Sequence, residues 1–415
     1  MMKNSVHTVS VFVTLAVLLL LPTCSHGQAP VLSGADVLVT DSLHLLKGKR
    51  VGLVTNRSAV CSDGRHLIEH LAGRKEFQLR KIFTPEHGFS GTFSAGERVG
   101  ERERIMGIPV VSLYGNQRAP RREDLYEIDI LIFDMQDVGV RFYTYASTML
   151  LSLQAAADNS VEFLVCDRPN PLAFLGARGP MLDPDLKSFV GMMPVPILHG
   201  MTLGELARMA VSEKWLVFRR APKLTVVRMR GWSRAMSFSE TGLAWIPPSP
   251  NIPRIETMLV YPATCYFEGT NISEGRGTDY PFALIGAPFL SADSVVTRFQ
   301  RYSVAGVTVI PVSFVPKRRT GAMNPKFEGQ VCQGVSITIT DRTKYDPMRL
   351  ALSLMATFFH FRSVEITKTK HFDYLVGEKD LAERLRSGTA VDDILARWNR
   401  VSSRFHDRSK SYYLY

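Results

Sequence analysis

Five apolar segments in the first half of the chain each stop abruptly at polar residues, and this pattern constrains the fold more than any other feature. The segments are rich in Val, Ile, Leu and Phe, and some are separated by stretches with helical spacing of apolar residues. Near-continuous apolar strands that alternate with helices are typical of a parallel sheet covered on both faces. We therefore predict an α/β fold. The predicted strands are 50–55, 79–83, 109–113, 129–133 and 161–166, and the predicted helices among them are 67–72 and 143–157.

The polar residues that follow these strands are expected to lie close together. In a parallel sheet the carboxyl ends of all strands share one edge, and open α/β sheets bind ligands outside that edge. A group of polar strand ends is therefore a candidate site rather than a set of unrelated turns. The residues that the pattern places at this edge are Asn56, Glu86, His87, Tyr114, Asp134, Gln136, Asp137, Asp167, Arg168 and Asn170.

The most distinctive strand end is the segment after 79–83. The strand breaks at Pro85 and presents a carboxyl group and an imidazole, Glu86 and His87, before glycines that allow a tight turn. Taken alone, this segment is equally compatible with a surface turn. No GxGxxG follows the first strand, and no GxxxxGK[ST] occurs in the chain. The sequence therefore does not support a nucleotide or nicotinamide cofactor, and we expect no cofactor.

The loop over 134–145 is the second dense polar segment. It holds two carboxylates, an amide, an arginine and aromatic residues, which suit a sugar because aromatic rings stack on its apolar faces while polar groups take its hydroxyls. Its arginine could bind an acidic substituent through two parallel hydrogen bonds. In the alternative interpretation an aspartate caps the following helix and the aromatic rings belong to the core. The candidates are Asp134, Gln136, Asp137, Arg141, Tyr143 and Tyr145.

The second half of the chain begins at a proline-dense segment, 247–253, which suits a linker or a rigid loop over a cleft. We place a domain boundary just after it, giving domains 31–255 and 256–415. A third dense segment, 267–278, holds two glutamates, an arginine and several glycines. The alternative for this segment is a polar surface loop with a weak, exposed ion pair between Glu268 and Arg276. Its candidate ligand-binding residues are Glu268, Asn271, Glu274 and Arg276.

Residues 1–27 have the features of a signal peptide. Lys3 precedes an apolar run over 9–21, which is too short to span a membrane but has the length of a signal-peptide core. We therefore expect an exported protein, periplasmic or secreted, with no transmembrane span after this segment. The run Leu21-Pro22-Thr23-Cys24 also resembles a loose bacterial lipobox, so a lipid anchor at Cys24 stays open.

The distribution of basic residues argues against a nucleic-acid partner, and the spacing of the cysteines and histidines matches no known metal site. The formal net charge of +11 favours an anionic partner, but the basic clusters lack the interleaved aromatic residues of a nucleic-acid platform. We therefore expect no nucleic-acid partner. No cysteine pair or histidine has the spacing of a metal site. We interpret Cys166 as a buried thiol, and His360, His371 and His406 as structural or surface residues.

Four segments together resemble the exo-β-N-acetylmuramidase family typified by NamZ, a glycoside hydrolase family. They are 84–89, 133–145, 167–171 and 267–278, and the resemblance extends over nearly all of the chain after the signal peptide. It implies a Rossmann-like, mostly parallel sheet domain, a smaller C-terminal domain, and an active site in the cleft between them. It also implies release of N-acetylmuramic acid from the non-reducing ends of peptidoglycan fragments. The catalytic glutamate proposed for that family falls on Glu86.

Glycoside hydrolysis needs a proton donor for the leaving oxygen and usually a second carboxylate. We expect Glu86 to be the acid, with His87 either relaying its proton or making a structural hydrogen bond. The second group is expected among Asp137, Asp134 and Glu274, unless the acetamido group of the substrate is the nucleophile. Muramic acid carries a lactyl carboxylate, which Arg141, Arg168 or Arg276 should bind. Further predicted substrate-binding residues are Asn56, Gln136, Tyr143, Tyr145, Asp167, Asn170, Glu268, Asn271 and Glu274.

Two other functions remain open at this point. Glu86, His87, Asp134 and Asp137 have the donor types of a hard metal ion, which would make the protein a metal-dependent hydrolase, although their spacing matches no known metal site. Alternatively, the cleft binds muramyl sugars without cleaving them. Loss of activity with a chelator favours the first alternative, and binding without release favours the second.

Overall fold

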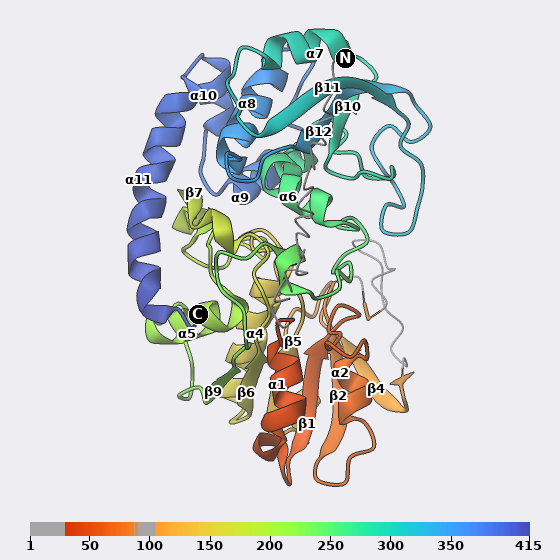
Figure 1. Cartoon of the computed structure of the whole chain (residues 1–415), viewed down its shortest axis with the longest axis vertical. Coiled ribbons are helices and arrows are strands. Elements are labelled where there is room, and N and C mark those ends of the chain that lie inside the picture. Colours follow the sequence, from red (N-terminus) through yellow and green to blue (C-terminus); the bar gives the residue numbers. More distant parts are fainter. Residues whose placement is uncertain (1–29, 87, 90–103) are drawn as a thin grey trace, which may run out of the picture.

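The computed structural model describes residues 30–86, 88–89 and 104–415. The predicted signal peptide, Cys24 and His87 lie outside the described residues. Figure 1 shows two parts stacked along the long axis, an α/β part formed by the first half of the chain and a smaller part formed by the second half. No helix in the described ranges is both long and apolar enough to cross a membrane.

The first part is built on a mostly parallel seven-stranded sheet of order β3-β4-β2-β1-β5-β6-β9, as the apolar segments predicted. Val54 of the central strand lies between Phe83 and Phe133 of its neighbours, and only the short β3 runs antiparallel. The apolar runs form strands because both faces of the sheet are buried. The strands are β1 (Arg50–Thr55), β2 (Gln78–Thr84), β3 (Arg104–Ile105), β4 (Ile108–Ser112), β5 (Ile130–Asp134), β6 (Glu162–Cys166) and β9 (Leu224–Val227).

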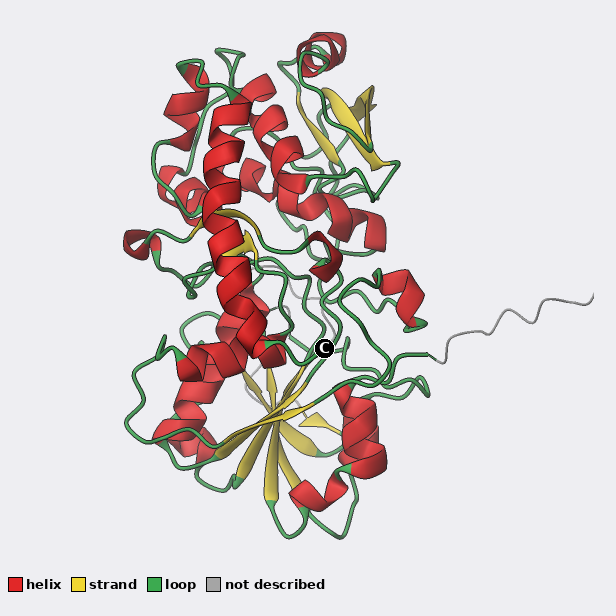
Figure 2. Ribbon diagram, turned by 60° about the vertical axis from the view of Figure 1, so that its left-hand side comes forward, coloured by secondary structure: helices red, strands yellow, loops and turns green. Residues whose placement is uncertain are grey.

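Helices cover both faces of this sheet (Figure 2). Alternate residues of β5 enter different cores: Ile130 and Ile132 pack on the side of α1 and α2, while Leu131 and Phe133 pack on the side of α4 and α5. The sheet is therefore doubly covered, which confirms the predicted α/β class. The helices are α1 (Gly34–Asp41), α2 (Leu67–Leu71), α3 (Arg122–Leu125), α4 (Thr144–Asp158) and α5 (Leu203–Ser212).

The second part has a three-stranded antiparallel sheet of order β10-β12-β11, with helices packed against it. A separate two-stranded ribbon, β7 (Arg178–Met181) with β8 (Pro196–Leu198), lies between the two parts. The elements of the second part are α6 (Ile255–Thr264), β10 (Leu284–Ala287), α7 (Ala292–Phe299), β11 (Val307–Phe314), β12 (Cys332–Ile339), α8 (Pro347–Phe358), α9 (Thr369–Val376), α10 (Leu381–Arg386) and α11 (Val391–Ser409).

The two parts are joined by more than the linker. Helix α11 runs down one side of the molecule, and the residues after it dock on the first part (Figure 1). There the Tyr415 hydroxyl donates to Asp167 (3.0 Å), and the Leu414 amide donates to Glu205 (2.8 Å). One apolar core also continues from α4 and α5 into α6, α8 and α11. The two parts are therefore held together by hydrogen bonds from the chain end and by a shared apolar core. The four cysteines in the described ranges, Cys61, Cys166, Cys265 and Cys332, are buried and free.

Candidate active site

The polar residues at the carboxyl edge of the sheet share one location, as predicted. Asn56 follows β1, Glu86 follows β2, Asp134 ends β5 and Asp167 follows β6. Their side chains nevertheless divide into two groups. One group is held by hydrogen bonds inside the fold, and the other lines a pocket between the two parts of the molecule.

Asp134 and Arg168 belong to the first group, because they pair with each other. Arg168 donates through Nε to Asp134 Oδ1 (2.5 Å) and through Nη2 to Oδ2 (3.0 Å), and both side chains are buried. Burial opposes the charge of Arg168, but Asp134 outweighs it and the pKa of the guanidinium is raised. Neither side chain lines the pocket. The geometry therefore speaks against Asp134 as the partner of Glu86 and against Arg168 as a ligand of a substrate carboxylate.

Arg141 lies inside the fold and not at the pocket where its substrate-binding role was expected. Its Nη1 donates to the carbonyls of Pro180 (2.9 Å) and Val195 (3.0 Å), and its Nη2 donates to those of Val376 (2.7 Å) and Leu375 (3.3 Å). Full burial lowers the pKa of Arg141 to about 10. The Nη1 and Nη2 groups of Arg141 are therefore hydrogen-bonded to four backbone carbonyls and do not face a substrate carboxylate. Arg141 instead ties the first part of the molecule to the end of α9.

Four further predicted ligand-binding residues also make their hydrogen bonds within the fold. Gln136 donates to the backbone carbonyls of Asp137 and Pro169, and Asn170 donates to that of Met201. Each of these hydrogen bonds is 2.8 Å long. Asp167 accepts hydrogen bonds from the start of α5 and from the chain end, while burial raises its pKa to about 7. Asn271 donates to a carbonyl of the second part (2.9 Å). These residues shape the loops around the pocket and do not line it.

Asp137 differs from these residues because one of its carboxyl oxygens is unpaired. Its Oδ2 accepts from the Gly139 amide (2.7 Å), while its buried Oδ1 has no hydrogen-bond partner in the described ranges. Burial raises the pKa of Asp137 to about 7 against the opposing effect of the two backbone amides near it. The side chain does not line the pocket, although it begins the loop that leads to Tyr143.

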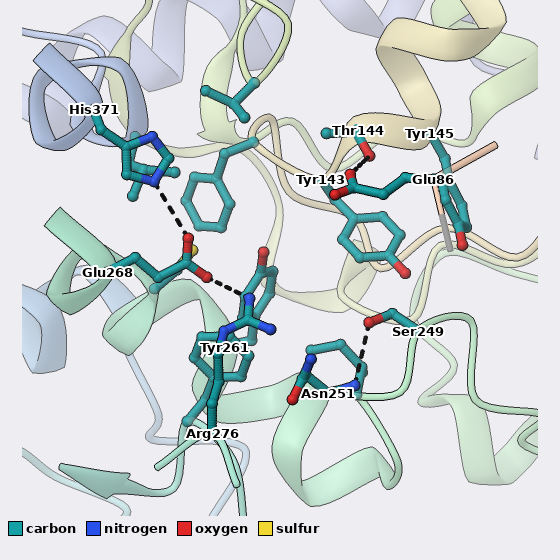
Figure 3. Close-up of a pocket in the computed structure, with 16 residues that line it drawn as sticks. Glu86, Tyr143, Thr144, Tyr145, Ser249, Asn251, Tyr261, Glu268, Arg276 and His371 are labelled. Carbon is teal, nitrogen blue, oxygen red and sulfur yellow. Dashed lines mark hydrogen bonds and ion pairs between the residues drawn. The ribbon is translucent and has the colours of Figure 1, made fainter. Parts of the chain in front are cut away.

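The pocket has a volume of about 220 Å³, and Glu86 lies on the wall formed by the start of α4 (Figure 3). The Thr144 hydroxyl donates to Glu86 Oε2 over 3.3 Å. The aromatic rings of Tyr143 and Tyr145 continue this wall, with their centroids 4.7 Å apart. Asn56 does not line the pocket, but its Nδ2 donates to the Tyr145 hydroxyl (2.7 Å) and so holds that ring in place.

The opposite wall carries a network of ion pairs from the second part of the molecule. Arg276 Nη2 donates to Glu268 (2.6 Å), and His371 contacts the other oxygen of Glu268 (3.3 Å), as Figure 3 shows. Behind them, Glu274 bridges Arg276 (3.3 Å) and Lys326 (3.0 Å). Burial opposes the ionised form of Glu268, but Arg276 and His371 outweigh it and lower its pKa to about 2. The alternative of a weak, exposed Glu268–Arg276 pair is wrong, because the side chains are only 20% and 27% exposed.

The proline-dense segment 247–253 supplies pocket residues that the sequence analysis did not single out. The Tyr145 hydroxyl donates to the Pro248 carbonyl (2.5 Å), which fixes the segment beside the pocket. Ser249 and Asn251 then line the pocket floor (Figure 3). In the sequence, the sign that this segment could reach the pocket was its density of prolines next to the predicted domain boundary. His371, interpreted as a structural or surface residue, also lines the pocket, and no local pattern distinguished it from the other histidines.

The donor set for a metal ion does not come together in the described ranges. No group of three or more His, Cys, Asp or Glu side chains there is arranged to hold a metal ion. Of the four residues predicted as possible metal ligands, Asp134 forms an ion pair with Arg168, and His87 lies outside the described residues.

The comparison with protein families decides between the remaining interpretations. The model described as "Exo-beta-N-acetylmuramidase NamZ, N-terminal" matches residues 51–256, and the corresponding C-terminal model matches residues 259–415. The chain belongs to the NamZ family. Its N-terminal NamZ region contains the sheet edge with Glu86, and its C-terminal NamZ region contributes Glu268, Arg276 and His371.

Individual relatives agree with this membership over nearly the whole chain. A Bacillus subtilis protein named "Peptidoglycan beta-N-acetylmuramidase NamZ" is 40% identical over 386 residues, which cover 92% of this chain and 91% of the relative. Two crystal structures of DUF1343 family proteins from Bacteroides fragilis are also similar, with TM-scores of 0.84 and 0.75. Each is 32% identical, and each match covers 93% of this chain and 99% of the other.

Proposed function

We propose that this protein is an exo-β-N-acetylmuramidase that releases N-acetylmuramic acid from the non-reducing ends of peptidoglycan fragments. The observation that carries the proposal is a small pocket with a carboxyl group on one wall and an arginine on the opposite wall. Its support from sequence is the NamZ family membership and the name of the Bacillus subtilis relative.

Glu86 is the proton donor in this proposal. Cleavage of a glycosidic bond requires a proton on the leaving oxygen. Among the residues that the structure describes, two carboxyl side chains line the pocket, those of Glu86 and Glu268. Glu268 is held in its ionised form by Arg276 and His371, with a pKa of about 2, so it is a poor acid for this step. Glu86 is the remaining carboxyl group, and the hydroxyl of Thr144 orients it.

Arg276 binds the lactyl carboxylate that distinguishes muramic acid from other amino sugars. Its Nη2 and Nε contact Glu268 and Glu274, and Nη1 makes no hydrogen bond to another of the described residues, so we assign it to the ligand. The two acids hold the guanidinium in a fixed orientation, which reduces the entropy lost when it binds a carboxylate. Of the three arginines expected as alternatives for this role, Arg141, Arg168 and Arg276, we therefore assign it to Arg276.

The size of the pocket supports removal of one sugar at a time. A volume of about 220 Å³ is below the range of roughly 300–1,000 Å³ that is usual for pockets holding drug-sized ligands. A pocket of this size favours a single terminal sugar over an internal stretch of a glycan chain.

The test compares hydrolysis of a chromogenic β-N-acetylmuramide by the wild type, Glu86→Gln and Glu127→Gln. We expect Glu86→Gln to lower kcat by about 100-fold or more, because general acid catalysis contributes roughly 10²–10⁴-fold. Glu127 is exposed and makes no hydrogen bond in the described ranges, so its variant should keep full activity. Unchanged hydrolysis by Glu86→Gln would contradict the assignment of Glu86. Binding without hydrolysis by the wild type would favour a sugar-binding protein, and activity that depends on added metal would favour a metal-dependent hydrolase.

We also propose that the protein is exported. The support is the signal-peptide pattern of residues 1–27, which lie outside the described residues. A protein found in the cytoplasm with residues 1–27 intact would contradict the proposal, and loss of membrane association in Cys24→Ala would establish the lipid anchor.

A further inference from the structure

The first part of the molecule has a second polar cavity, at the opposite edge of the sheet from the pocket with Glu86. It is an open groove of about 790 Å³ that crosses the amino ends of three parallel strands. Arg50 begins β1, Asp129 directly precedes β5 and Ser160 precedes β6, and all three line the groove. This edge of the sheet is the one farther from the second part (Figure 1). The groove shares no lining residue with the pocket and is therefore a separate site.

The groove carries an excess of positive charge. Among the described residues, four arginines and two aspartates line it. Arg50 is paired, because it donates to Asp129 through Nε (3.1 Å) and Nη2 (2.7 Å), and this contact lowers the pKa of Asp129. The second aspartate, Asp158, accepts from the backbone amide of Arg219 (2.7 Å) and not from its guanidinium. One ion pair within the groove thus leaves three arginine side chains without an acidic partner there.

These three side chains are exposed and arranged around one concave surface. The guanidinium groups of Arg122 and Arg219 make no hydrogen bond or ion pair with another described residue. Arg220 donates to the Ser160 hydroxyl, which is a neutral group. Protein surfaces usually intersperse basic with acidic side chains, so unpaired guanidinium groups that share a groove favour an anionic ligand. A guanidinium group binds a carboxylate through two parallel hydrogen bonds.

An exposed aromatic ring accompanies the arginines. Tyr126 lines the same groove and is 84% exposed. A single exposed aromatic residue is ordinary on a protein surface, but this ring lies in a cavity beside guanidinium groups. An aromatic ring presents an apolar face with a polar tip, and the apolar face packs against the C–H face of a sugar ring. The groove therefore combines the contacts needed for a sugar with those needed for a carboxylate.

We propose that this groove is a second, non-catalytic binding site for a carboxylate-bearing glycan strand of peptidoglycan. The identity of the glycan rests on the proposed function, in which the pocket with Glu86 takes a single terminal sugar. Arg122 and Arg219 bind carboxylates of the strand, and Tyr126 packs on one of its sugar rings. Because the two sites lie at opposite edges of the sheet, the groove binds a neighbouring strand and holds the enzyme on the polymer between cleavages.

The test measures co-sedimentation with insoluble peptidoglycan from which attached phosphate polymers have been removed, in a Glu86→Gln background that leaves the polymer intact. We expect Arg122→Gln/Arg219→Gln to raise the dissociation constant about 10-fold at low salt and to weaken its salt dependence. The control is Arg301→Gln/Arg400→Gln, which removes the same charge from two exposed arginines of the second part. Equal weakening by the two double variants would show attraction by net charge alone and overturn the inference, as would unchanged binding by the groove variant.

Tyr126→Ala tests whether the ligand is a glycan. We expect binding of the purified peptidoglycan to weaken about 5-fold, since the packing of a ring on a sugar is lost. Binding of polyglutamate, which has carboxylates but no sugar rings, should not change. An equal effect on both polymers would overturn the glycan assignment. Binding that requires the attached phosphate polymers would assign the groove to a phosphodiester and also overturn the inference.

Two controls separate this inference from the fold and from the proposed function. The side chains of Arg122, Arg219 and Tyr126 are exposed, so their variants should keep the wild-type Tm, and a lower Tm would show a structural role and overturn the inference. A wild type that hydrolyses the chromogenic muramide while the groove variant binds peptidoglycan normally overturns only this inference. A wild type that binds peptidoglycan through the groove but hydrolyses no muramide contradicts the proposed function instead.

Discussion

Glu268 and Asp137 are both carboxyl groups largely shielded from water, yet their pKa values move in opposite directions. Glu268 faces Arg276 and His371, whose combined effect exceeds the cost of burial and lowers its pKa to about 2. Among the described residues, the groups that favour the ionised form of Asp137 are the backbone amides of Val138 and Gly139. Burial outweighs them and raises its pKa to about 7. The identity of the neighbours, rather than burial alone, thus decides which carboxyl group of the site is ionised at neutral pH.

The raised pKa of Asp137 predicts a pH-dependent change in stability. The folded protein holds this proton up to about pH 7, whereas the unfolded chain releases it near the ordinary value of 3.8. The contribution of Asp137 to stability therefore falls as pH rises from about 4 to about 7 and is constant above that. Asp137→Asn does not ionise, so its Tm relative to wild type should rise across this range. A Tm difference that is independent of pH would contradict the raised pKa.

Glu268→Gln tests the ion-pair network on the wall opposite Glu86. We expect a loss of roughly 1–3 kcal/mol in the free energy of unfolding, because the variant weakens the hydrogen bonds of the largely buried residue 268 to Arg276 and His371. KM for the muramide should rise about 10-fold as Arg276 loses its orientation. Asp279→Asn is the control, since it breaks an exposed pair with Arg319 and should leave the free energy of unfolding nearly unchanged. Equal effects of the two variants in chemical denaturation would contradict a structural role for the network.

At the scale of secondary-structure elements, the end of α9 is held by a residue far away in the sequence. Arg141 donates to the carbonyls of Leu375 and Val376 at the end of α9, and Gly377 follows in the left-handed region with φ of +83°. A Cβ atom on Gly377 would lie 2.0 Å from Arg141 Nη2. The end of α9 and the guanidinium are therefore packed too closely for any side chain, and α9 also carries His371 of the pocket.

Gly377→Ala and Gly388→Ala separate this packing from the conformational cost of the left-handed backbone. Gly388 has φ of +89°, but a Cβ atom there meets nothing within 4 Å. We expect Gly388→Ala to cost roughly 1–2 kcal/mol in the free energy of unfolding, the usual penalty for a Cβ atom in this region. Gly377→Ala should cost roughly 3–5 kcal/mol, since it also displaces a buried, hydrogen-bonded charge. Similar unfolding midpoints for the two variants would show that Arg141 does not fix the end of α9.

For the molecule as a whole, the strands of the parallel sheet could be predicted because their signal is local. Segments buried on both faces must be apolar throughout, and each predicted strand agrees with the structure to within one or two residues. Helix α1, with only eight residues and few large apolar side chains, gave no comparable signal and was missed. The joining of the two parts through the chain end after α11 was also not predictable, because it depends on contacts such as Tyr415 with Asp167.

The site was predictable in its types of residue but not in their roles. Arg141, Arg168 and Arg276 are equivalent as sequence, and only their partners distinguish them. The four carbonyls around Arg141 lie between 39 and 235 positions away, so no local pattern announces them. Glu86 could be placed because it directly follows a strand of the sheet, whereas His371 lies on a helix whose sequence shows only an amphipathic pattern.

The central claim is that the pocket removes single N-acetylmuramic acid residues from non-reducing ends. The most direct measurement is mass spectrometry of the products from two glycan tetrasaccharides, one ending in N-acetylmuramic acid and one ending in N-acetylglucosamine at the non-reducing end. We expect the wild type to release one equivalent of free N-acetylmuramic acid from the first and nothing from the second, and Glu86→Gln to release nothing from either. Internal cleavage to disaccharides, or no release from the first tetrasaccharide, would contradict the account.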